Sequence, residues 1–341
     1  MTDKQWQQLL AVLSGQVLDP LPCAFIIDCP WLPGWYGTKV IDYLADEQIW
    51  FDANRKAVET FPQVWFLPGF WAEYGMCTEP SAFGATCQFP EDGFPSAKRS
   101  ILRISDIDDL EMPDPRTDGL LPFVIQRLRW ARPQIEDLGH RIRFSVSRGP
   151  LNIASFLMGT TEFLMAIKTD PGPIHKFLGL ITEFLKQWHQ LQRDSFASID
   201  GIMILDDVVG FIGPDDFAEF AFPYLQALFA DGPSVRFFHN DAPCSQSIAQ
   251  YSKMGVNLYN PGSNEDINQL RKLAGDRITI LGNIPARDIL AQGTPDQVRQ
   301  TVKQMLQHVA DKRRWIPSCG GGMPPDVTTD NIRAFVNAVQ Y

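Results

Sequence analysis

The sequence predicts one α/β domain, a TIM (β/α)8 barrel that spans residues 1–341. Short runs rich in β-branched and aromatic residues recur eight times, and helical patterns separate them. Most of these runs are continuously apolar, which is typical of parallel strands buried on both faces. A doubly wound sheet is the alternative architecture, but no Gly-rich phosphate-binding fingerprint follows any of the predicted strands.

The elements begin with an amphipathic helix in "MTDKQWQQLLAVLSGQ", which places Trp6, Leu9, Leu10 and Leu13 on one face. We expect the strands at residues 22–28, 63–69, 142–147, 201–207, 234–240, 255–260, 278–283 and 314–319. We expect helices at residues 161–169, 173–195, 215–230, 244–253, 264–274, 296–311 and 328–339. Helix caps are expected at Asp215, Ser245, Asn264 and Thr294.

Residues 71–140 do not fit the pattern of one helix, because they are rich in Pro, Gly, Asp and aromatic residues. They predict a long insertion after the second strand, with a small hairpin near residues 84–105. Insertions at the C-terminal face of a barrel usually build the wall of the site or a lid, so we expect this one near the barrel mouth.

Composition narrows the class of partner. The net charge is −10 with no basic run, which argues against nucleic acid and against anionic membrane surfaces. No stretch approaches the length of apolar sequence that a membrane helix needs, and the first residues lack the features of a signal peptide. The sequence therefore predicts a cytoplasmic protein. The six cysteines form no CxxC pair and are better interpreted as thiols or ligands than as disulfides.

Polar residues follow nearly all of the predicted strands, where a TIM barrel carries its chemistry. His239 ends the fifth strand and Cys319 ends the eighth, so both point into one mouth. Imidazole nitrogen and thiolate are preferred ligands of zinc, and a catalytic zinc takes three protein ligands plus an open position. The pair therefore predicts a metal site. The other strand ends carry Asp28, Phe70 with Glu73, Arg148, Asp206 with Asp207, Asn260 and Asn283.

Four segments carry a resemblance to a known family: "GPLNIASFLMG", "GIMILDDVVGFIGPDDFAEFAFPYLQALF", "ITILGNIPARDILAQGTPDQVRQTV" and "IPSCGGGMPPDVTTDNIRAFVNAV". The chain resembles the uroporphyrinogen decarboxylase superfamily strongly over residues 149–340 and weakly over the first 140. That resemblance implies a TIM barrel. The superfamily includes porphyrinogen decarboxylases and zinc-dependent methyltransferases of corrinoid systems.

Two departures count against the decarboxylase branch. Decarboxylases hold a substrate with many carboxylates and place an arginine motif close to the N-terminus, whereas the first arginine here is Arg55. They also carry a histidine between glycines in the loop after the last strand, where this chain has Gly321.

The methyltransferase branch uses a His-x-Cys pair after one strand and a cysteine after the last. His239 and Cys319 match two of these positions, and Asp241 stands where the remaining cysteine is expected. The resemblance thus implies zinc held by His239, Asp241 and Cys319, with Cys244 as the alternative third ligand. Asp241 is preferred because it keeps the spacing and because carboxylate oxygen is a normal zinc ligand.

A carboxylate in place of a thiolate leaves a harder, more Lewis-acidic zinc, which suits a leaving oxygen that develops charge. No Asp-x-His-x-x-Gly corrinoid signature occurs in the chain, so the corrinoid must arrive on a separate protein. The resemblance therefore implies methyl transfer from a small methyl ether or methylamine to the cobalt of that protein. The alternatives are a methylcobalamin:thiol methyltransferase, a decarboxylase-like lyase acting on a small acid, and a scaffold that has lost the reaction.

Further residues are candidates for roles at the same mouth. Asp206 and Asp207 are candidate catalytic residues, which would orient a substrate hydroxyl, support the zinc ligands or serve as a ligand. The candidate substrate-binding residues are Glu73, Tyr74, Arg148 and Asn283.

Overall fold

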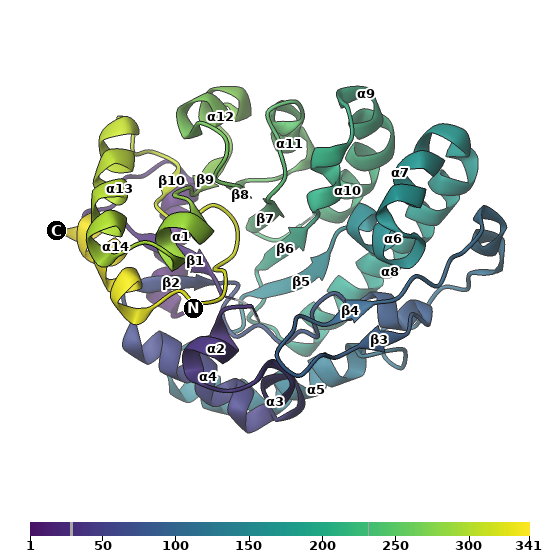
Figure 1. The fold of residues 1–341 in the computed structure, drawn as a ribbon, viewed down its shortest axis with the longest axis horizontal. Helices are drawn as coiled ribbons and strands as arrows, with labels where there is room; N and C mark the ends of the chain where they lie inside the picture. The colour runs from purple at the N-terminus through teal and green to yellow at the C-terminus, as the bar shows by residue number, and fades with distance from the viewer. Residues whose placement is uncertain (28–29, 231) are drawn as a thin grey trace.

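The computed structural model describes residues 1–27, 30–230 and 232–341, so the strand-end Asp28 lies outside the described residues. All eight predicted strands are present, and the TIM barrel prediction is confirmed. The strands form a ring with helices outside it (Figure 1). They are β1 (Cys23–Ile26), β2 (Val64–Leu67), β5 (Phe144–Arg148), β6 (Gly201–Leu205), β7 (Val235–Asn240), β8 (Leu258–Pro261), β9 (Thr279–Leu281) and β10 (Trp315–Ile316).

The strands are all parallel, in the orders β10-β9-β8-β7-β6-β5 and β1-β2. β1 meets the segment after β10 through a bridge between Ile26 and Gly322. Within the described residues, β2 and β5 share no ladder. In register, Arg148 lies opposite Leu205, and Leu205 lies opposite His239. Arg148 and His239 therefore stand at the same level of the barrel, two strands apart.

The predicted N-terminal helix is α1 (Asp3–Leu13), and it packs against the residues that line the inside of the barrel. Trp6 makes an edge-on ring contact with Phe144, with centroids 5.4 Å apart. The helix starts with a complete capping box formed by Thr2 and Gln5. A second, larger core fills the space between the strands and the surrounding helices.

The predicted helices are confirmed, with shifted boundaries. Thr294 caps its helix as predicted, whereas the helix expected from Asn264 is capped by Asp266. The helix expected at 215–230 is interrupted by a π-helical turn over Phe217–Ala221. The helices are α2 (Leu32–Tyr36), α3 (Val40–Ala45), α4 (Glu47–Thr60), α5 (Leu121–Asp137), α6 (Pro150–Met158), α7 (Thr160–Thr169), α8 (Pro171–Ser195), α9 (Pro214–Asp216), α10 (Phe222–Phe229), α11 (Ile248–Met254), α12 (Ile267–Ala274), α13 (Pro295–His308) and α14 (Thr329–Gln340).

Residues 71–140 combine an irregular part with a barrel helix. The predicted hairpin is present as the antiparallel strands β3 (Cys87–Gln88) and β4 (Ser96–Ala97). Two 3-10 turns cover Pro80–Phe83 and Ile104–Asp109. The last part is α5, which precedes β5 as a barrel helix should. The irregular part of the predicted insertion therefore ends before residue 121.

No single helix in the described ranges is long and apolar enough to cross a bilayer. α6 and α7 together reach that length and composition only as a pair bent by 107°.

Candidate active site at the carboxyl ends of the strands

The geometry around His239 fixes which of its ring nitrogens carries the proton. Its Nδ1 lies 2.8 Å from the Oδ1 of Asn260 on the neighbouring strand. The Asn260 amide cannot be reversed, because its Nδ2 donates to the carbonyl of Leu281 at 2.7 Å. Nδ1 of His239 therefore donates to Asn260, and in the neutral form of the ring the lone pair lies on Nε2. The histidine is almost fully buried, with 6% of its surface exposed.

Two carboxylates face that lone pair. Nε2 of His239 lies 3.7 Å from Oδ1 of Asp241 and 3.9 Å from Oδ1 of Asp207. Asp207 also accepts a hydrogen bond from the backbone N–H of Asp241 at 2.8 Å, so the two loops are tied together. Burial raises the pKa of Asp241, His239 opposes this shift, and the charge of Asp207 adds to it. Two carboxylates beside one imidazole favour positive charge at this point, whether as a proton on Nε2 or as a bound cation.

The carboxylate of Asp241 occupies the space beside the last strand's loop. A Cβ built on Gly321 would lie 2.4 Å from Oδ1 of Asp241, and Gly321 has a φ of 78°. The backbone conformation therefore favours glycine at position 321. A larger side chain at this position would displace Asp241.

The two candidate cysteines face different groups. The thiol of Cys319 is fully buried and lies 3.6 Å from the carbonyl oxygen of Gly321. The thiol of Cys244 donates to the carboxylate of Glu265 at 2.8 Å, which also accepts the backbone N–H of Cys244. Cys244 is therefore hydrogen-bonded to the loop after β8, which favours Asp241 over Cys244 as the third zinc ligand.

The predicted zinc ligands His239, Asp241 and Cys319 do not come together in this structure. Across residues 1–27, 30–230 and 232–341, no three His, Cys, Asp or Glu side chains lie close enough together to hold a metal ion. The donor atoms that do converge are Nε2 of His239 and the carboxylates of Asp207 and Asp241. Their chemistry suits a divalent cation, and the thiol of Cys319 would have to leave Gly321 to join them.

Asp206 holds a different place from Asp207. Its carboxylate is fully buried and accepts the backbone N–H groups of Leu151 and Asn152 at 2.9 and 3.0 Å, at the first turn of α6. Burial raises its pKa well above the usual value despite these hydrogen bonds. Asp206 thus fastens α6 to the end of β6, and of the two predicted catalytic aspartates only Asp207 faces His239.

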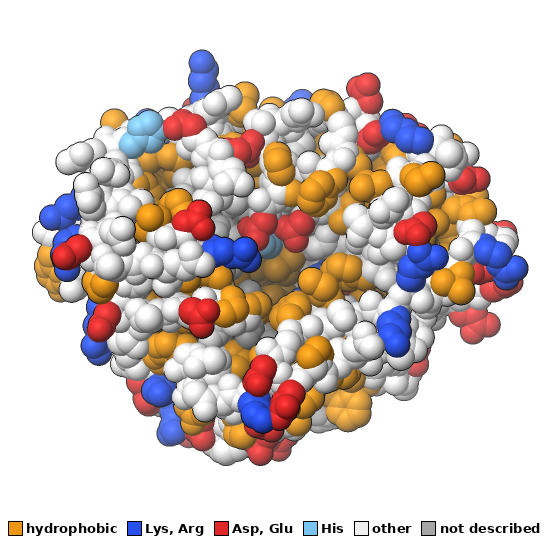
Figure 2. Space-filling model, viewed as in Figure 1, with side chains coloured by type: hydrophobic (Ala, Val, Ile, Leu, Met, Phe, Trp, Pro, Cys, Tyr) orange, Lys and Arg blue, Asp and Glu red, His pale blue; other side chains and the backbone are white. Residues whose placement is uncertain are grey.

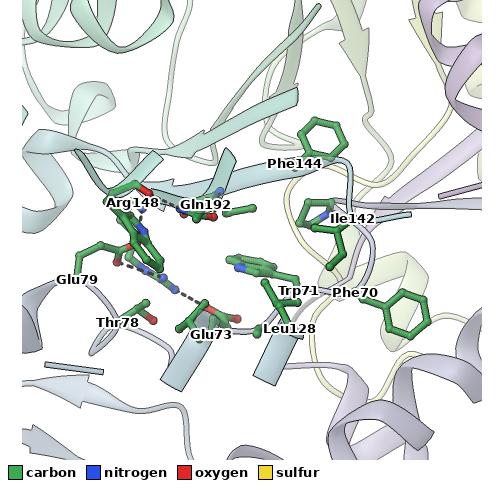
Figure 3. Close-up of a pocket in the computed structure, with 15 residues that line it drawn as sticks. Phe70, Trp71, Glu73, Thr78, Glu79, Leu128, Ile142, Phe144, Arg148 and Gln192 are labelled. Atoms are coloured by element: carbon green, nitrogen blue, oxygen red, sulfur yellow. Dashed lines mark hydrogen bonds and ion pairs between the residues drawn. The ribbon is translucent and has the colours of Figure 1, made fainter. Parts of the chain in front are cut away.

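The predicted substrate anchor Arg148 is already engaged. Its guanidinium lies 2.8 Å from Glu73 and 3.7 Å from Glu79, and all three side chains are buried (Figure 3). Glu79 also accepts the backbone N–H of Arg148 at 3.1 Å. A guanidinium held by two carboxylates is not a free anchor for an acidic substrate.

The remaining predicted substrate residues serve the loops around them. The amide of Asn283 donates to the carbonyls of Gly262 and Glu265 at 3.1 and 2.9 Å. The guanidinium carbon of Arg127 lies over the ring of Tyr74, 5.2 Å from the centroid of that ring. Neither side chain is brought to His239 by a contact that the structure records, and their roles in substrate binding stay predictions.

The mouth is acidic as well as partly apolar. Figure 2 shows a hollow in the middle of this face, with acidic, hydrophobic and basic side chains at its rim and a histidine deep within it. Sequence reasoning noted Asn260 only as a polar strand end and missed its role as the partner of His239. The signal was available in the register, since His239 and Asn260 are paired across β7 and β8.

The comparisons with known proteins agree on a family and a fold. A family model described as uroporphyrinogen decarboxylase (URO-D) matches residues 5–341. The uroporphyrinogen decarboxylase of Psychromonas ingrahamii is 26% identical over 277 residues, which is 77% of this chain and 75% of the relative. That of Chlorobium phaeobacteroides is 28% identical over 247 residues, which is 69% of this chain and 68% of the relative.

Among solved structures, a methyltransferase from Methanosarcina mazei superposes with a TM-score of 0.83 at 19% identity, covering 97% of both chains. A B12-independent methionine synthase from Shewanella superposes with a TM-score of 0.56 at 12% identity, covering 94% of this chain and 95% of the other. At these identities the likeness shows the fold alone.

Proposed function

Because the chain belongs to the uroporphyrinogen decarboxylase family, with a family model matching residues 5–341, we propose a function within the methyltransferase branch of that fold. The chain transfers a methyl group from a small methyl ether or methylamine to the cobalt of a corrinoid carried by a separate protein. His239, Asp241 and Cys319 hold a zinc ion at the barrel mouth, and Asp207 supports that set.

The observation that carries this proposal is that Nε2 of His239 faces two carboxylates, at 3.7 and 3.9 Å. A neutral imidazole whose other nitrogen donates to an amide oxygen is the usual arrangement of a metal-ligating histidine. When bound, zinc supplies a Lewis acid for the oxygen or nitrogen that loses its methyl group. Asn260 orients the ring of His239, and Asp207 holds the backbone N–H of Asp241.

The solved methyltransferase with a TM-score of 0.83 supports the fold of this proposal, and the charge of the mouth supports its chemistry. A polycarboxylate substrate would meet Asp207 and Asp241 at the mouth, while Arg148 is held by Glu73 and Glu79. A small uncharged or cationic methyl donor meets no such repulsion.

The names of the curated relatives favour a second candidate, a decarboxylase-like lyase acting on a small acid. Arg148 would have to exchange one of its carboxylate partners for the substrate. Transfer in the opposite direction, from methylcobalamin to a thiol, is the third candidate and uses the same metal ligands.

The experiment combines metal analysis with a spectroscopic assay. We expect about one zinc per chain in the wild type. His239→Ala, Asp241→Ala and Cys319→Ala should each lower zinc content, while the control Cys244→Ser should not. A wild type that takes up no zinc under any loading condition refutes the proposal, and loss of zinc in the control alone makes Cys244 the ligand.

The assay mixes the protein with cob(I)alamin and a panel of methoxylated aromatics, methylamines and betaines. Zinc-dependent formation of methylcobalamin that is lost in Asp241→Ala supports the proposed direction. Consumption of methylcobalamin on addition of a thiol supports the third candidate. Metal-independent release of carbon dioxide from a small acid supports the lyase.

A further inference from the structure

A second polar site lies in the gap between β2 and β5, apart from His239. The gap is filled by the chain that follows β2, and a cavity remains inside it (Figure 3). Phe70, Trp71, Ile142 and Phe144 make one end of this cavity apolar. Its polar lining, the polar end, consists of Glu73, Thr78, Glu79, Arg148, Trp188 and Gln192.

The charges at the polar end do not balance. Two carboxylates, Glu73 and Glu79, face the single guanidinium of Arg148, and the three residues are 3%, 1% and 7% exposed. A buried cluster with a surplus negative charge is costly, and binding one proton removes the surplus.

Three polar atoms at this end have no hydrogen-bond partner among the described residues: Oε1 of Glu73, Oε2 of Glu79 and Nε1 of Trp188. Trp188 comes from α8, lines the same cavity and is 1% exposed. Two carboxyl groups and one indole N–H together need a small group that both donates and accepts. Water has this bonding pattern, and buried waters typically bridge such groups.

We propose that this cavity is an internal proton-and-water site, in which Glu79 is held as the neutral carboxylic acid and one water bridges Glu73, Glu79 and Trp188. Glu73 stays ionised as the partner of Arg148. The inference does not depend on the proposed methyl transfer, since Arg148 stands two strands away from His239 in the barrel.

The geometry distinguishes the two glutamates. Glu73 makes a direct 2.8 Å ion pair with the guanidinium, whereas the nearer oxygen of Glu79 lies 3.7 Å from it. Burial raises the pKa of Glu79, the charge of Arg148 opposes this, and Glu73 adds to it. The proton therefore belongs on Glu79.

Among the described residues that line the cavity, Arg148 is the one cation beside Glu79. The charged neighbours of Glu79 from the segment after β2 and from β5 are Glu73 and Arg148. The lining from α8 and α5 is uncharged and consists of Trp188, Gln192, Val124 and Leu128.

Infrared spectroscopy of the intact protein tests the proton. At neutral pH we expect a protonated-carboxyl band that is sensitive to deuterium exchange and is absent from Glu79→Gln. Asp206→Asn is the matched control, because Asp206 is another buried carboxyl whose pKa is raised by burial, and it should leave this band in place. A spectrum in which Glu79→Gln removes no protonated-carboxyl intensity overturns the proposal.

Thermal stability gives an independent readout. Because glutamine imitates the neutral acid, Glu79→Gln should keep the wild-type melting temperature at neutral pH, while Glu73→Gln should lower it. A loss in Glu79→Gln as large as that in Glu73→Gln shows an ionised Glu79 and overturns the proposal. A high-resolution crystal structure should place one water within hydrogen-bond distance of all three unpartnered atoms, and an empty cavity refutes the water.

Discussion

At the scale of single residues, uncharged residues set the orientation and position of the titratable side chains at the mouth. Asn260 has no chemistry of its own, yet its fixed amide binds Nδ1 of His239 and so leaves Nε2 to face the carboxylates. Gly321 acts by lacking a side chain, since Asp241 fills the space that a Cβ would take. Uncharged residues therefore set the orientation of His239 and the position of Asp241 at this mouth.

Replacement of Asn260 by alanine should weaken zinc binding, because His239 loses the partner that holds its orientation. Loss of such a supporting hydrogen bond typically costs roughly 10- to 100-fold in metal affinity. Competition with a zinc-binding dye measures the effect. Asn257→Ala is the control, because this asparagine lies just before β8 and bonds to Ser234 and Arg236 at the far end of the strand. Equal affinity in both variants would contradict the role given to Asn260.

The neighbouring aspartates should separate by phenotype. Asp206→Asn places an amide group against the backbone N–H donors of Leu151 and Asn152, so we expect a loss of about 1–3 kcal/mol in the free energy of unfolding. Asp207→Asn, with a side chain that is 40% exposed, should change stability little and metal binding more. Urea unfolding and zinc titration of both variants decide this. Equal stability losses would show that Asp207 is structural too.

At the scale of elements, apolar runs predicted the strands well because each strand is buried on both faces. The sequence could not predict which groups would meet across loops. The preference for Asp241 over Cys244 rests on spacing, and it stays a prediction. The structure adds that Glu265, which comes after the next strand, accepts a hydrogen bond from the Cys244 thiol. Likewise, the sequence predicts Arg148 as a substrate anchor at a strand end. The structure shows that the segment after β2 brings Glu73 and Glu79 to its guanidinium.

The N-terminal helix should contribute substantially to the free energy of unfolding of the barrel. Trp6 is 3% exposed and packs on Phe144 inside the ring of strands. Trp6→Ala should therefore lower the free energy of unfolding by about 3–5 kcal/mol, through lost burial and the cavity left behind. Denaturant titration measures this change. Lys4→Ala, on the exposed face of the same helix, should cost almost nothing, and similar losses in both variants would refute the packing role.

At the scale of the whole molecule, buried titratable groups make folding stability depend on pH. His189 is held between Ser145 and Ser147 with both ring nitrogens at 2.9 Å from a hydroxyl. Burial lowers its pKa to about 3, and the positive charge of Arg193 adds to this. Between pH 6.5 and about 3, His189 is therefore protonated in the unfolded chain but neutral in the folded chain.

This linkage predicts that stability falls as the pH drops below 6.5 and continues to fall toward pH 3. One such histidine contributes at most about 1.4 kcal/mol per pH unit to the slope. Urea midpoints measured from neutral to mildly acidic pH give the slope, and His189→Gln should flatten it relative to the wild type. An unchanged slope in His189→Gln would mean that other groups, such as His140, carry the acid dependence.

The charge distribution also bears on the substrate named by the curated relatives. A porphyrinogen that carries many carboxylates needs cations at the mouth, but this chain has a net charge of −10 and presents Asp207 and Asp241 there. Arg148 is engaged by two glutamates, and Asp241 fills the space beside Gly321. Repulsion between like charges in such a hollow disfavours both encounter and binding.

We therefore expect no coproporphyrinogen when the protein is incubated anaerobically with uroporphyrinogen, under conditions in which an authentic decarboxylase converts it. Raising the ionic strength screens the repulsion between exposed charges but supplies no anchor, so it should not restore turnover. Asp207→Asn with Asp241→Asn removes both mouth carboxylates and should still give no product, because the missing cations are not replaced. Conversion by the wild type at an ordinary enzymatic rate would place the chain with the decarboxylases and leave the converging acceptors around His239 without the role proposed for them.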